Sequence, residues 1–476
     1  MRLVAEAHEL RIYSATSFLG HGVDANSLRK ALEFQPHAIV AQGTTTDAGP
    51  SYLGSGKPVM ARQALQRDLE LIVAAAQEAG IPFICSVGGA GAKPHVELAL
   101  ELLEETARRH GWSLTIGVVW SDVDPQYLLD RLQAGVVMPR LVPVDRFPER
   151  LDAETVKAST RIVAQVGPEV LVRLLEEHPD LDGIITGRAL DIGLYAALPL
   201  RHGFPRALSM HFGKVMEDGA LAADPGSGND GLMGFLRQDH FEVVPVSEER
   251  RCTPASVALH AFYERPDPTR EANPGGVLDV ASARYEQVTE RSVRVSGARW
   301  IEADEYRVKL EGVRKAGYRS ISIGGVRDPR FIAASDQIVQ DCYAAVREYF
   351  AFLGEGAYHF TIRTYGKNGV LGPSEPLAGA QPHEICLLLE AVSRDQETAD
   401  SICSFASSFL SHHGFPGRLS TAGNLAIPFS PGRAISAGEV YQWSIWHGLP
   451  LEDPGEPFRV EVRQIGGHAG REEGKA

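Results

Sequence analysis

Residues 38–56 read AIVAQGTTTDAGPSYLGSG, a short apolar run that passes directly into a loop rich in hydroxyl groups and glycine. The run Ala38–Ala41 has the length and composition of a buried strand. In a parallel-sheet enzyme, ligand-binding groups follow the carboxyl ends of strands. An ordinary glycine–proline turn, whose hydroxyls bond backbone groups, is the alternative. We predict that residues 42–56 form an active-site loop, with four candidate side chains: Thr44, Thr45, Thr46 and Asp47.

The same strand–loop–helix order recurs about five times over the first two hundred residues. Helical spacing over residues 62–79, with Gly80 as its stop, is one clear unit, and the apolar run 113–120 begins another. This alternation predicts an α/β fold with a parallel sheet and helices on both faces. Crossover geometry then brings the strand-to-helix loops to one edge of the sheet: Ser17–His21, Thr44–Asp47, Gly88–Lys93, Ser121–Asp124 and Thr186–Asp191.

The regular alternation stops near residue 203, and a second part begins after the amphipathic helix predicted over 330–353. Gly354-Glu355-Gly356 is the candidate boundary. We therefore predict an α/β domain of residues 1–353, which includes an insertion and strand-rich subregion at 203–330. A smaller α+β C-terminal domain would comprise 357–476, with strands at 359–366, 384–392 and 424–429 and a helix at 396–412.

Composition restricts the class of protein. With 476 residues the chain is too long for one simple core. Its 61 acidic and 47 basic side chains give a net charge of -14, which argues against nucleic acid as a partner. The five cysteines are scattered and form no CxxC pair, so a disulfide framework or thiolate zinc site is not expected. Because the first twenty residues are too polar for a signal peptide and no segment is apolar enough to span a bilayer, we expect a cytoplasmic protein without a membrane partner.

Two turns at the predicted sheet edge could hold an anion. Arg188, between Gly187 and a helix, could clamp a substrate carboxylate, although Asp191 three residues later could pair with it instead. The cluster Gly88-Gly89-Ala90-Gly91 would let an anion approach the backbone, or would serve close helix–sheet packing. Neither turn is a dinucleotide fingerprint or a P-loop, so the cofactor stays unknown. Lys214 is a further binding candidate, or one half of a solvated pair with Glu217.

The run 251–264, RCTPASVALHAFYE, is dense in chemically capable side chains. His260 and Glu264, four residues apart on a predicted helix, could form an acid–base pair, two metal ligands or a salt bridge. No third ligand follows at a diagnostic spacing, so no metal ligand is assigned, although a divalent metal stays open. Cys252 is either a nucleophile or inert packing.

Several motifs together resemble the acyclic terpene utilisation family of AtuA type. They are TTTDAGPSYLGSG, GGAGAKPH, ITGRALD, RRCTPASVALHAFYE, PGGVLD, YRVKLEG and GYRSISIGGVRDP, in this order. The resemblance covers residues 9 to 345, and the final hundred residues are similar to an appended domain found in part of the family. It implies a role in the breakdown of branched acyclic terpenoids and other carboxylic acids, in the neighbourhood of acyl-CoA metabolism. It supplies no catalytic residue set that can be transferred.

We expect a catabolic enzyme that acts on a small carboxylate or acyl-CoA by acid–base chemistry of lyase, hydratase or isomerase type, as a homo-oligomer. Asp47, His260 and Glu264 are its candidate catalytic groups. Substrate would be held by Thr44, Thr45, Thr46, Gly88, Gly89, Arg188, Asp191 and Lys214. One alternative is a hydrolase that uses Cys252 or a metal-bound water. Another is a non-catalytic subunit that binds an acyl ligand within a catabolic complex.

Overall fold

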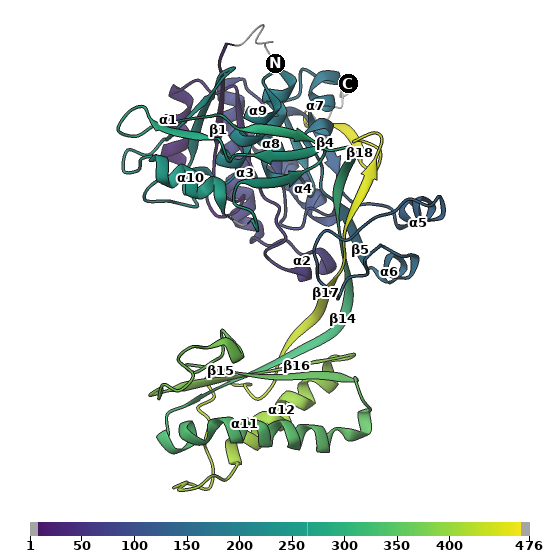
Figure 1. The fold of residues 1–476 in the computed structure, drawn as a ribbon, viewed down its shortest axis with the longest axis vertical. Helices are drawn as coiled ribbons and strands as arrows, with labels where there is room; N and C mark the ends of the chain where they lie inside the picture. Colours follow the sequence, from purple (N-terminus) through teal and green to yellow (C-terminus); the bar gives the residue numbers. More distant parts are fainter. Residues whose placement is uncertain (1–7, 264, 468–476) are drawn as a thin grey trace, which may run out of the picture. The chain divides into compact units, whose positions relative to one another are not determined.

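The computed structural model describes residues 8–263 and 265–467, and the chain divides into two compact units. The first unit comprises residues 1–313 and 443–476, and the second comprises 314–442. The chain passes from the first unit into the second within β14 (Tyr306–Val326) and returns within β17 (Ile435–Leu451) (Figure 1). This division differs from the boundary predicted at residues 354–356. A single 21-residue strand serves both units, so no glycine-rich linker marks the crossing.

A ten-stranded mixed sheet forms the centre of the first unit, which confirms the predicted α/β class. Its middle is parallel, in the order β1 (Leu10–Ser14), β2 (Ala38–Ala41), β3 (Phe83–Ser86), β6 (Gly183–Thr186) and β4 (Ser113–Trp120). Antiparallel strands extend it on both sides: β7 (Leu232–Leu236), β8 (Phe241–Pro245), β12 (Val293–Ser296) and β11 (Arg284–Gln287) beside β1, and β18 (Arg459–Gly466) beside β4. The region predicted as an insertion therefore contributes strands to the same sheet.

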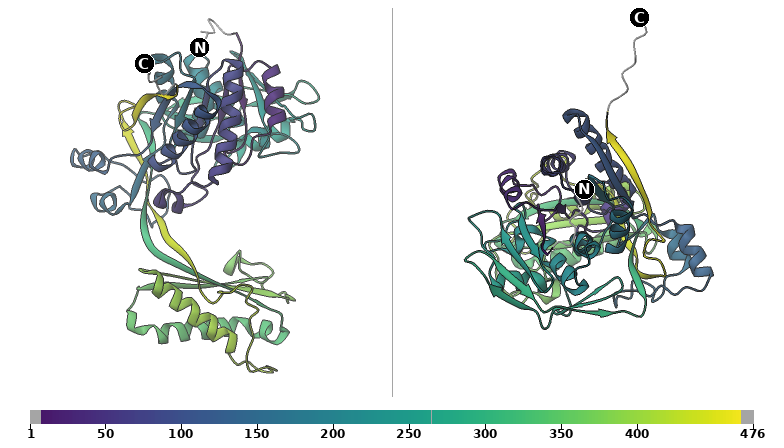
Figure 2. Two further views of the ribbon diagram at one scale, coloured as in Figure 1. Left: turned by 180° about the vertical axis from the view of Figure 1, so that it is seen from behind. Right: turned by 90° about the horizontal axis from the view of Figure 1, so that it is seen from above.

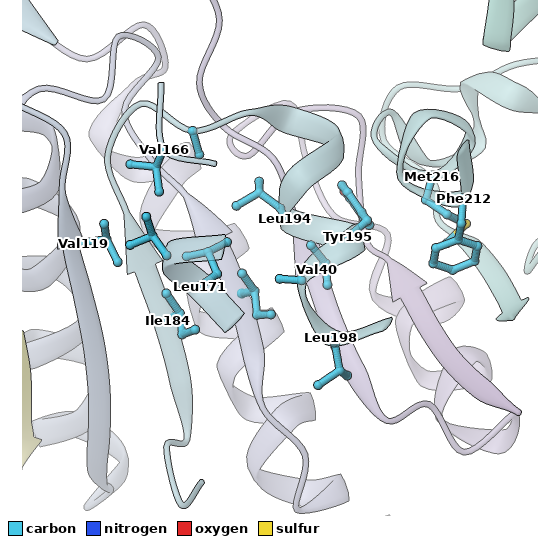
Figure 3. Packing of buried hydrophobic residues seen from close by; sticks show 14 of the residues in the cluster. Val40, Val119, Val166, Leu171, Ile184, Leu194, Tyr195, Leu198, Phe212 and Met216 are labelled. Atoms are coloured by element: carbon cyan, nitrogen blue, oxygen red, sulfur yellow. The ribbon is translucent and has the colours of Figure 1, made fainter. Parts of the chain in front are cut away.

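Helices cover both faces of this sheet because side chains alternate along each strand. Ile39 and Phe83 pack with α1 (Ala25–Glu33), α3 (Arg62–Ala79) and α4 (Lys93–His110), and their neighbours Val40 and Ile84 face the other side. There they meet α7 (Pro168–Glu177), α8 (Asp191–Arg201) and α9 (Arg206–Met216). Figure 3 shows this second face, with strand residues such as Val40 close to Leu194 of α8. The left view of Figure 2 shows the purple and blue helices of the N-terminal part in front of the strands.

Smaller elements complete the first unit. They are α2 (Pro50–Ser55), α5 (Pro125–Gln133), α6 (Ala153–Ala158), β5 (Arg161–Ala164), η1 (Gly219–Ala222) and α10 (Pro254–Phe262), with a three-stranded sheet of β9 (Arg270–Asn273), β10 (Gly276–Asp279) and β13 (Arg299–Glu302). The predicted loop 42–56 thus contains a short helix, which Pro50 can begin because its missing amide needs no partner there. Across the described ranges, none of the helices has both the length and the apolar character needed to cross a membrane.

The second unit is α+β, with its strands in the order β15 (Tyr358–Tyr365), β16 (Ile385–Ser393), β14 and β17, and two helices, α11 (Pro329–Tyr349) and α12 (Gln396–His412). Its core joins these helices to β16, where every second residue is buried. The predicted strand at 424–429 is wrong: the segment makes one isolated bridge, between Ala426 and Gly325. Pro428 has no amide to donate to a ladder, which limits pairing beyond that bridge.

The loop after β1 is anchored by one buried carboxylate from α3. Asp68 accepts hydrogen bonds from the backbone amides of Gly20, Gly22 and Val23, at 2.9, 3.0 and 2.9 Å. The Asp68 residue is 1% exposed, so no solvent competes for these donors. This contact fixes the path of residues 17–23 at the edge of the sheet.

We therefore expect Asp68→Asn to destabilise this loop by about 2 kcal/mol, because hydrogen bonds to a buried charge become bonds to a neutral amide. Hydrogen exchange of the amides of Gly20, Gly22 and Val23 should accelerate roughly thirtyfold, a factor that corresponds to that energy. The matched control is Glu78→Gln, at an exposed position of the same helix, which should leave the exchange unchanged. Equal protection in Asp68→Asn and wild type would show that the anchor is not needed.

Candidate active site

A cavity of about 480 Å³ lies where the loops after β1, β2 and β6 meet. Its polar and charged lining consists of Ser17, His21, Gln42, Thr45, Asp47, Gln165, Arg188, Asp191, Lys214, Glu217, Asp218, Tyr263, Glu271 and Lys309. The loops after β3 and β4 support it from behind: the carbonyl of Gly91 accepts hydrogen bonds from the Ser121 hydroxyl at 2.7 Å and the Arg188 amide at 3.1 Å. The volume falls in the range of small-molecule sites.

Arg188 lines the cavity but is 3% exposed, and its guanidinium is engaged by protein groups. Its Nε and Nη2 donate to the two carboxylate oxygens of Glu311, at 3.1 and 3.3 Å. Its Nη1 donates to the carbonyl of Ala189 at 2.8 Å and lies 3.4 Å from the Asp191 carboxylate. Thr44 also accepts from Nη1, at 3.4 Å. The arginine thus holds the cavity wall together, and the substrate clamp expected of it stays a prediction.

Glu311 lies at the back of this wall, between two cations. Its carboxylate is 2% exposed and also accepts from Lys309 Nζ at 2.7 Å. Burial opposes the ionisation of Glu311, but Arg188 and Lys309 outweigh it, so the pKa of Glu311 lies below its ordinary value. Lys309 packs over the Trp446 ring, 4.1 Å from its centroid, and reaches the cavity. Glu311 thereby fixes both positive groups on one side of the site.

Among the carboxyl groups that line the cavity, Asp191 has a pKa close to physiological pH. Burial, together with the charge of Asp218, raises its pKa to about 7, against the opposing effect of Arg188, Lys309 and Lys214. Its side chain keeps 29% exposure, and it is part of the cavity lining. A carboxyl group with such a pKa can both accept and release a proton at physiological pH.

Opposite Asp191, an acidic cluster comes from the end of α9 and the residues that follow it. Lys214 Nζ lies 2.5 Å from Glu217 Oε1 and 4.2 Å from the centre of the Tyr263 ring. The Tyr263 hydroxyl donates a short hydrogen bond to Asp218, which also accepts from the Gln42 amide at 3.0 Å. Burial, with Asp218 and other acidic neighbours, raises the pKa of Glu217 well above its ordinary value despite Lys214. The predicted solvated pair of Lys214 and Glu217 is thus a buried one.

His260, a predicted catalytic residue, is buried beside this cluster and stacks on Tyr263. Burial lowers its pKa to about 4, against the charge of Asp218, so the imidazole is neutral at pH 7. Its Nε2 makes no hydrogen bond with any described residue and lies 3.9 Å from Asp218 Oδ2. Three potential metal-ligand atoms, one each from Glu217, Asp218 and His260, lie within 4.8 Å of one another. The predicted partner Glu264 lies outside the described residues.

The remaining predicted residues divide by position. Thr45 and the exposed Asp47 line the cavity, whereas Thr44 is buried behind it and Thr46 is not part of the lining. Gly88 and Gly89, both with positive φ, are also outside the lining: a Cβ atom there would lie 2.2 Å from His95 and 2.0 Å from Val59. These glycines permit close packing, and their expected contact with an anion stays a prediction.

Cys252 is not placed to act as a nucleophile. It has no exposure, lies in the apolar core, and burial raises the pKa of its thiol to about 12. A thiol that stays protonated and buried is inert. The structure therefore argues against the hydrolase alternative in which Cys252 is the nucleophile.

Sequence reasoning missed Lys309, Glu311, Asp218 and Glu271 as parts of the site. Lys309 and Glu311 belong to β14, far along the chain from the strand-to-helix loops where binding groups were sought. Glu311 follows Arg307 and Lys309 in alternation with the apolar Val308 and Leu310, a pattern that indicates an exposed position. The local sequence therefore gave no signal that this carboxylate is buried between two cations.

The sequence model of the family described as acyclic terpene utilisation family protein AtuA matches residues 244–425. Over this range the chain is similar to the AtuA family. The match confirms the predicted resemblance and includes the motifs RRCTPASVALHAFYE, PGGVLD, YRVKLEG and GYRSISIGGVRDP. The AtuA match also continues beyond residue 353, into the part expected to be appended. Neither the curated proteins nor the solved structures give a significant match to the chain.

Proposed function

We propose that this protein is a catabolic enzyme that moves a proton at the carbon beside a carbonyl group, in a reaction of lyase, hydratase or isomerase type. Its substrate would be a small carboxylic acid or acyl thioester. The family description, acyclic terpene utilisation, supports a role in breaking down branched carbon chains. The cavity size of about 480 Å³ suits the acyl part of such a substrate.

The observation that carries the proposal is the position of Asp191. Its carboxyl group is held at the cavity wall with a pKa of about 7, while Lys309 and Lys214 present positive charge to the same space. Proton abstraction beside a carbonyl needs a base of this kind and a positive group near the oxygen that becomes an enolate. We assign Asp191 as the base.

Lys309 is the cation best placed to hold the developing oxyanion. An ammonium group has three donors, and one described acceptor, Glu311, engages it within hydrogen-bond range. Arg188, by contrast, directs its donors to Glu311, Ala189 and Thr44. Asp47 remains a second candidate base at the exposed part of the lining.

Solvent deuterium incorporation tests this proposal without knowledge of the final product. We expect wild-type protein in heavy water to label the α-carbon of at least one member of a panel of branched hydroxy acids, unsaturated acids and their CoA thioesters. Mass spectrometry detects the added deuterium. Lys309→Met should lower kcat for this labelling about tenfold or more, since a charge-assisted contact to the developing oxyanion is lost.

The matched control is Lys93→Met, which removes an exposed lysine paired with Glu97 and should leave the labelling unchanged. Binding of an acyl thioester without any labelling across the panel would contradict the proposal. That outcome would favour the non-catalytic acyl-binding alternative.

A further inference from the structure

We propose that Glu217, Asp218 and His260 bind one divalent transition-metal ion of the Mn²⁺ or Zn²⁺ class. The three residues come from two neighbouring segments, the end of α9 and the last turn of α10. All three are buried, and their ligand atoms lie within 4.8 Å of one another. The proposal concerns binding, and its test measures no step of the reaction assigned to Asp191.

The first argument is the unpartnered imidazole nitrogen. His260 has a side chain that is 7% exposed, and its Nε2 has no hydrogen-bond partner among the described residues. A buried polar atom without a partner is costly, so such an atom calls for an ion or a water molecule. The nitrogen lies 3.9 Å from Asp218 Oδ2, too far for a hydrogen bond. An ion about 2.1 Å from each ligand would bridge a gap of this size.

The second argument is the charge of Asp218. Its carboxylate is 12% exposed, and its described hydrogen-bond partners are two neutral groups, the Gln42 amide and the Tyr263 hydroxyl. Glu217 pairs with Lys214 and Glu271 with Arg265, but no lysine or arginine of the described residues forms an ion pair with Asp218. A divalent cation would compensate this negative charge.

The third argument is the support that surrounds these carboxylates. Gln42 Nε2 also donates to the carbonyl of Ser17 at 2.7 Å, so two hydrogen bonds fix this nitrogen as it holds Asp218 Oδ1. Tyr263 holds the other oxygen of Asp218, and Lys214 holds Glu217 Oε1. Metal-binding carboxylates are oriented by outer hydrogen bonds of this kind. The contacts leave the groups directed toward one another rather than toward solvent.

The ligand chemistry selects the ion. Two carboxylates and one imidazole suit Mn²⁺ and Zn²⁺, whereas Ca²⁺ and Mg²⁺ prefer oxygen ligands alone. The absence of a thiol from the trio argues against a site selective for soft metals. Mn²⁺ is the more useful probe because its unpaired electrons report directly on the ligand nitrogen.

The test uses the full chain after chelator treatment, titrated with Mn²⁺ alone and followed by electron paramagnetic resonance. We expect one tightly bound ion per chain, with nitrogen hyperfine coupling in pulsed spectra. His260→Gln should weaken binding at least about a hundredfold and remove the nitrogen coupling. Asp218→Asn should weaken it similarly, which keeps the test decisive if one variant fails to fold.

The matched control is His21→Gln, because His21 belongs to the cavity lining, as Glu217 and Asp218 do, and is not one of the three ligands. It should retain the wild-type affinity and coupling. No stoichiometric binding by folded wild type would overturn the proposal and leave a bridging water between His260 and Asp218. Unchanged affinity or persistent coupling in His260→Gln would also overturn it. Since no turnover is measured, these outcomes are independent of the deuterium-labelling result.

Discussion

Asp191→Asn is expected to slow deuterium incorporation into the substrate by about 10²- to 10⁴-fold, the range that removal of a general base produces. Asparagine fills nearly the same volume and can still accept a hydrogen bond from Arg188, so the cavity should keep its shape. What it loses is the ability to take up a proton. The effect should therefore fall on kcat, with KM changed much less.

The same substitution should stabilise the protein at pH 8. Burial and the charge of Asp218 raise the pKa of Asp191 to about 7 in the folded protein, against the opposing effect of Arg188, Lys309 and Lys214. In the unfolded chain the pKa is about 3.9, so the folded protein keeps this proton up to a higher pH. Ionisation of Asp191 therefore lowers the free energy of unfolding. This loss is absent below about pH 4, grows as the pH rises toward 7, and is constant above pH 7. We expect Asp191→Asn to gain up to about 4 kcal/mol at pH 8, the energy that corresponds to the difference between these two pKa values, with little difference from wild type at pH 4.

Asp47→Asn is the matched comparison, since Asp47 lines the same cavity but is exposed. It should leave the free energy of unfolding within about 0.5 kcal/mol of wild type. The two variants are compared by their rates of deuterium labelling and by their denaturation midpoints at pH 4 and pH 8. If Asp47→Asn abolishes labelling and Asp191→Asn does not, the base is Asp47, as the sequence predicted.

Local signals made part of the fold predictable. The helix predicted at 62–79 and the strand predicted at 113–120 have these bounds in the structure. Gly80 ends the helix in the left-handed region, at φ 63°, a conformation that glycine adopts without strain. The alternation of strands and helices also sufficed to predict the loops that meet at the cavity. Each of these inferences depends on neighbours in the sequence.

Contacts between distant residues explain what the sequence did not predict. Arg188 was interpreted as open to a substrate, but its partner Glu311 follows it by 123 residues, on a strand. The glycines after β3 were candidates for anion contact. Only the folded structure shows that His95 and Val59 occupy the space beside them. A residue's type indicates what it can bind, whereas the fold determines which of its donors are already used.

Glu311→Ala should lower the free energy of unfolding of the first unit by about 3–5 kcal/mol at pH 7, because it leaves the buried Arg188 and the partly buried Lys309 without their shared anion. Both cations are anchored by this one carboxylate, which is 2% exposed. The guanidinium of Arg188 would lose its bonds from Nε and Nη2, and the wall of the cavity would lose its support. Denaturant unfolding followed by hydrogen exchange of β5 and β6 reports on this unit alone.

The pH dependence separates the charge of Glu311 from its packing. Burial raises the pKa of Glu311, but Arg188 and Lys309 lower it further, so the net pKa is below its ordinary value. Its contribution to stability is therefore full above about pH 5 and is lost as pH falls through the folded-state pKa. The deficit of Glu311→Ala should shrink in acid, leaving only the packing loss. Glu305→Ala, which breaks the exposed pair with Arg307, should cost less than about 0.5 kcal/mol at any pH. A deficit below 1 kcal/mol in Glu311→Ala at pH 7 would mean that solvent compensates the two cations, and that the cavity wall does not depend on this carboxylate.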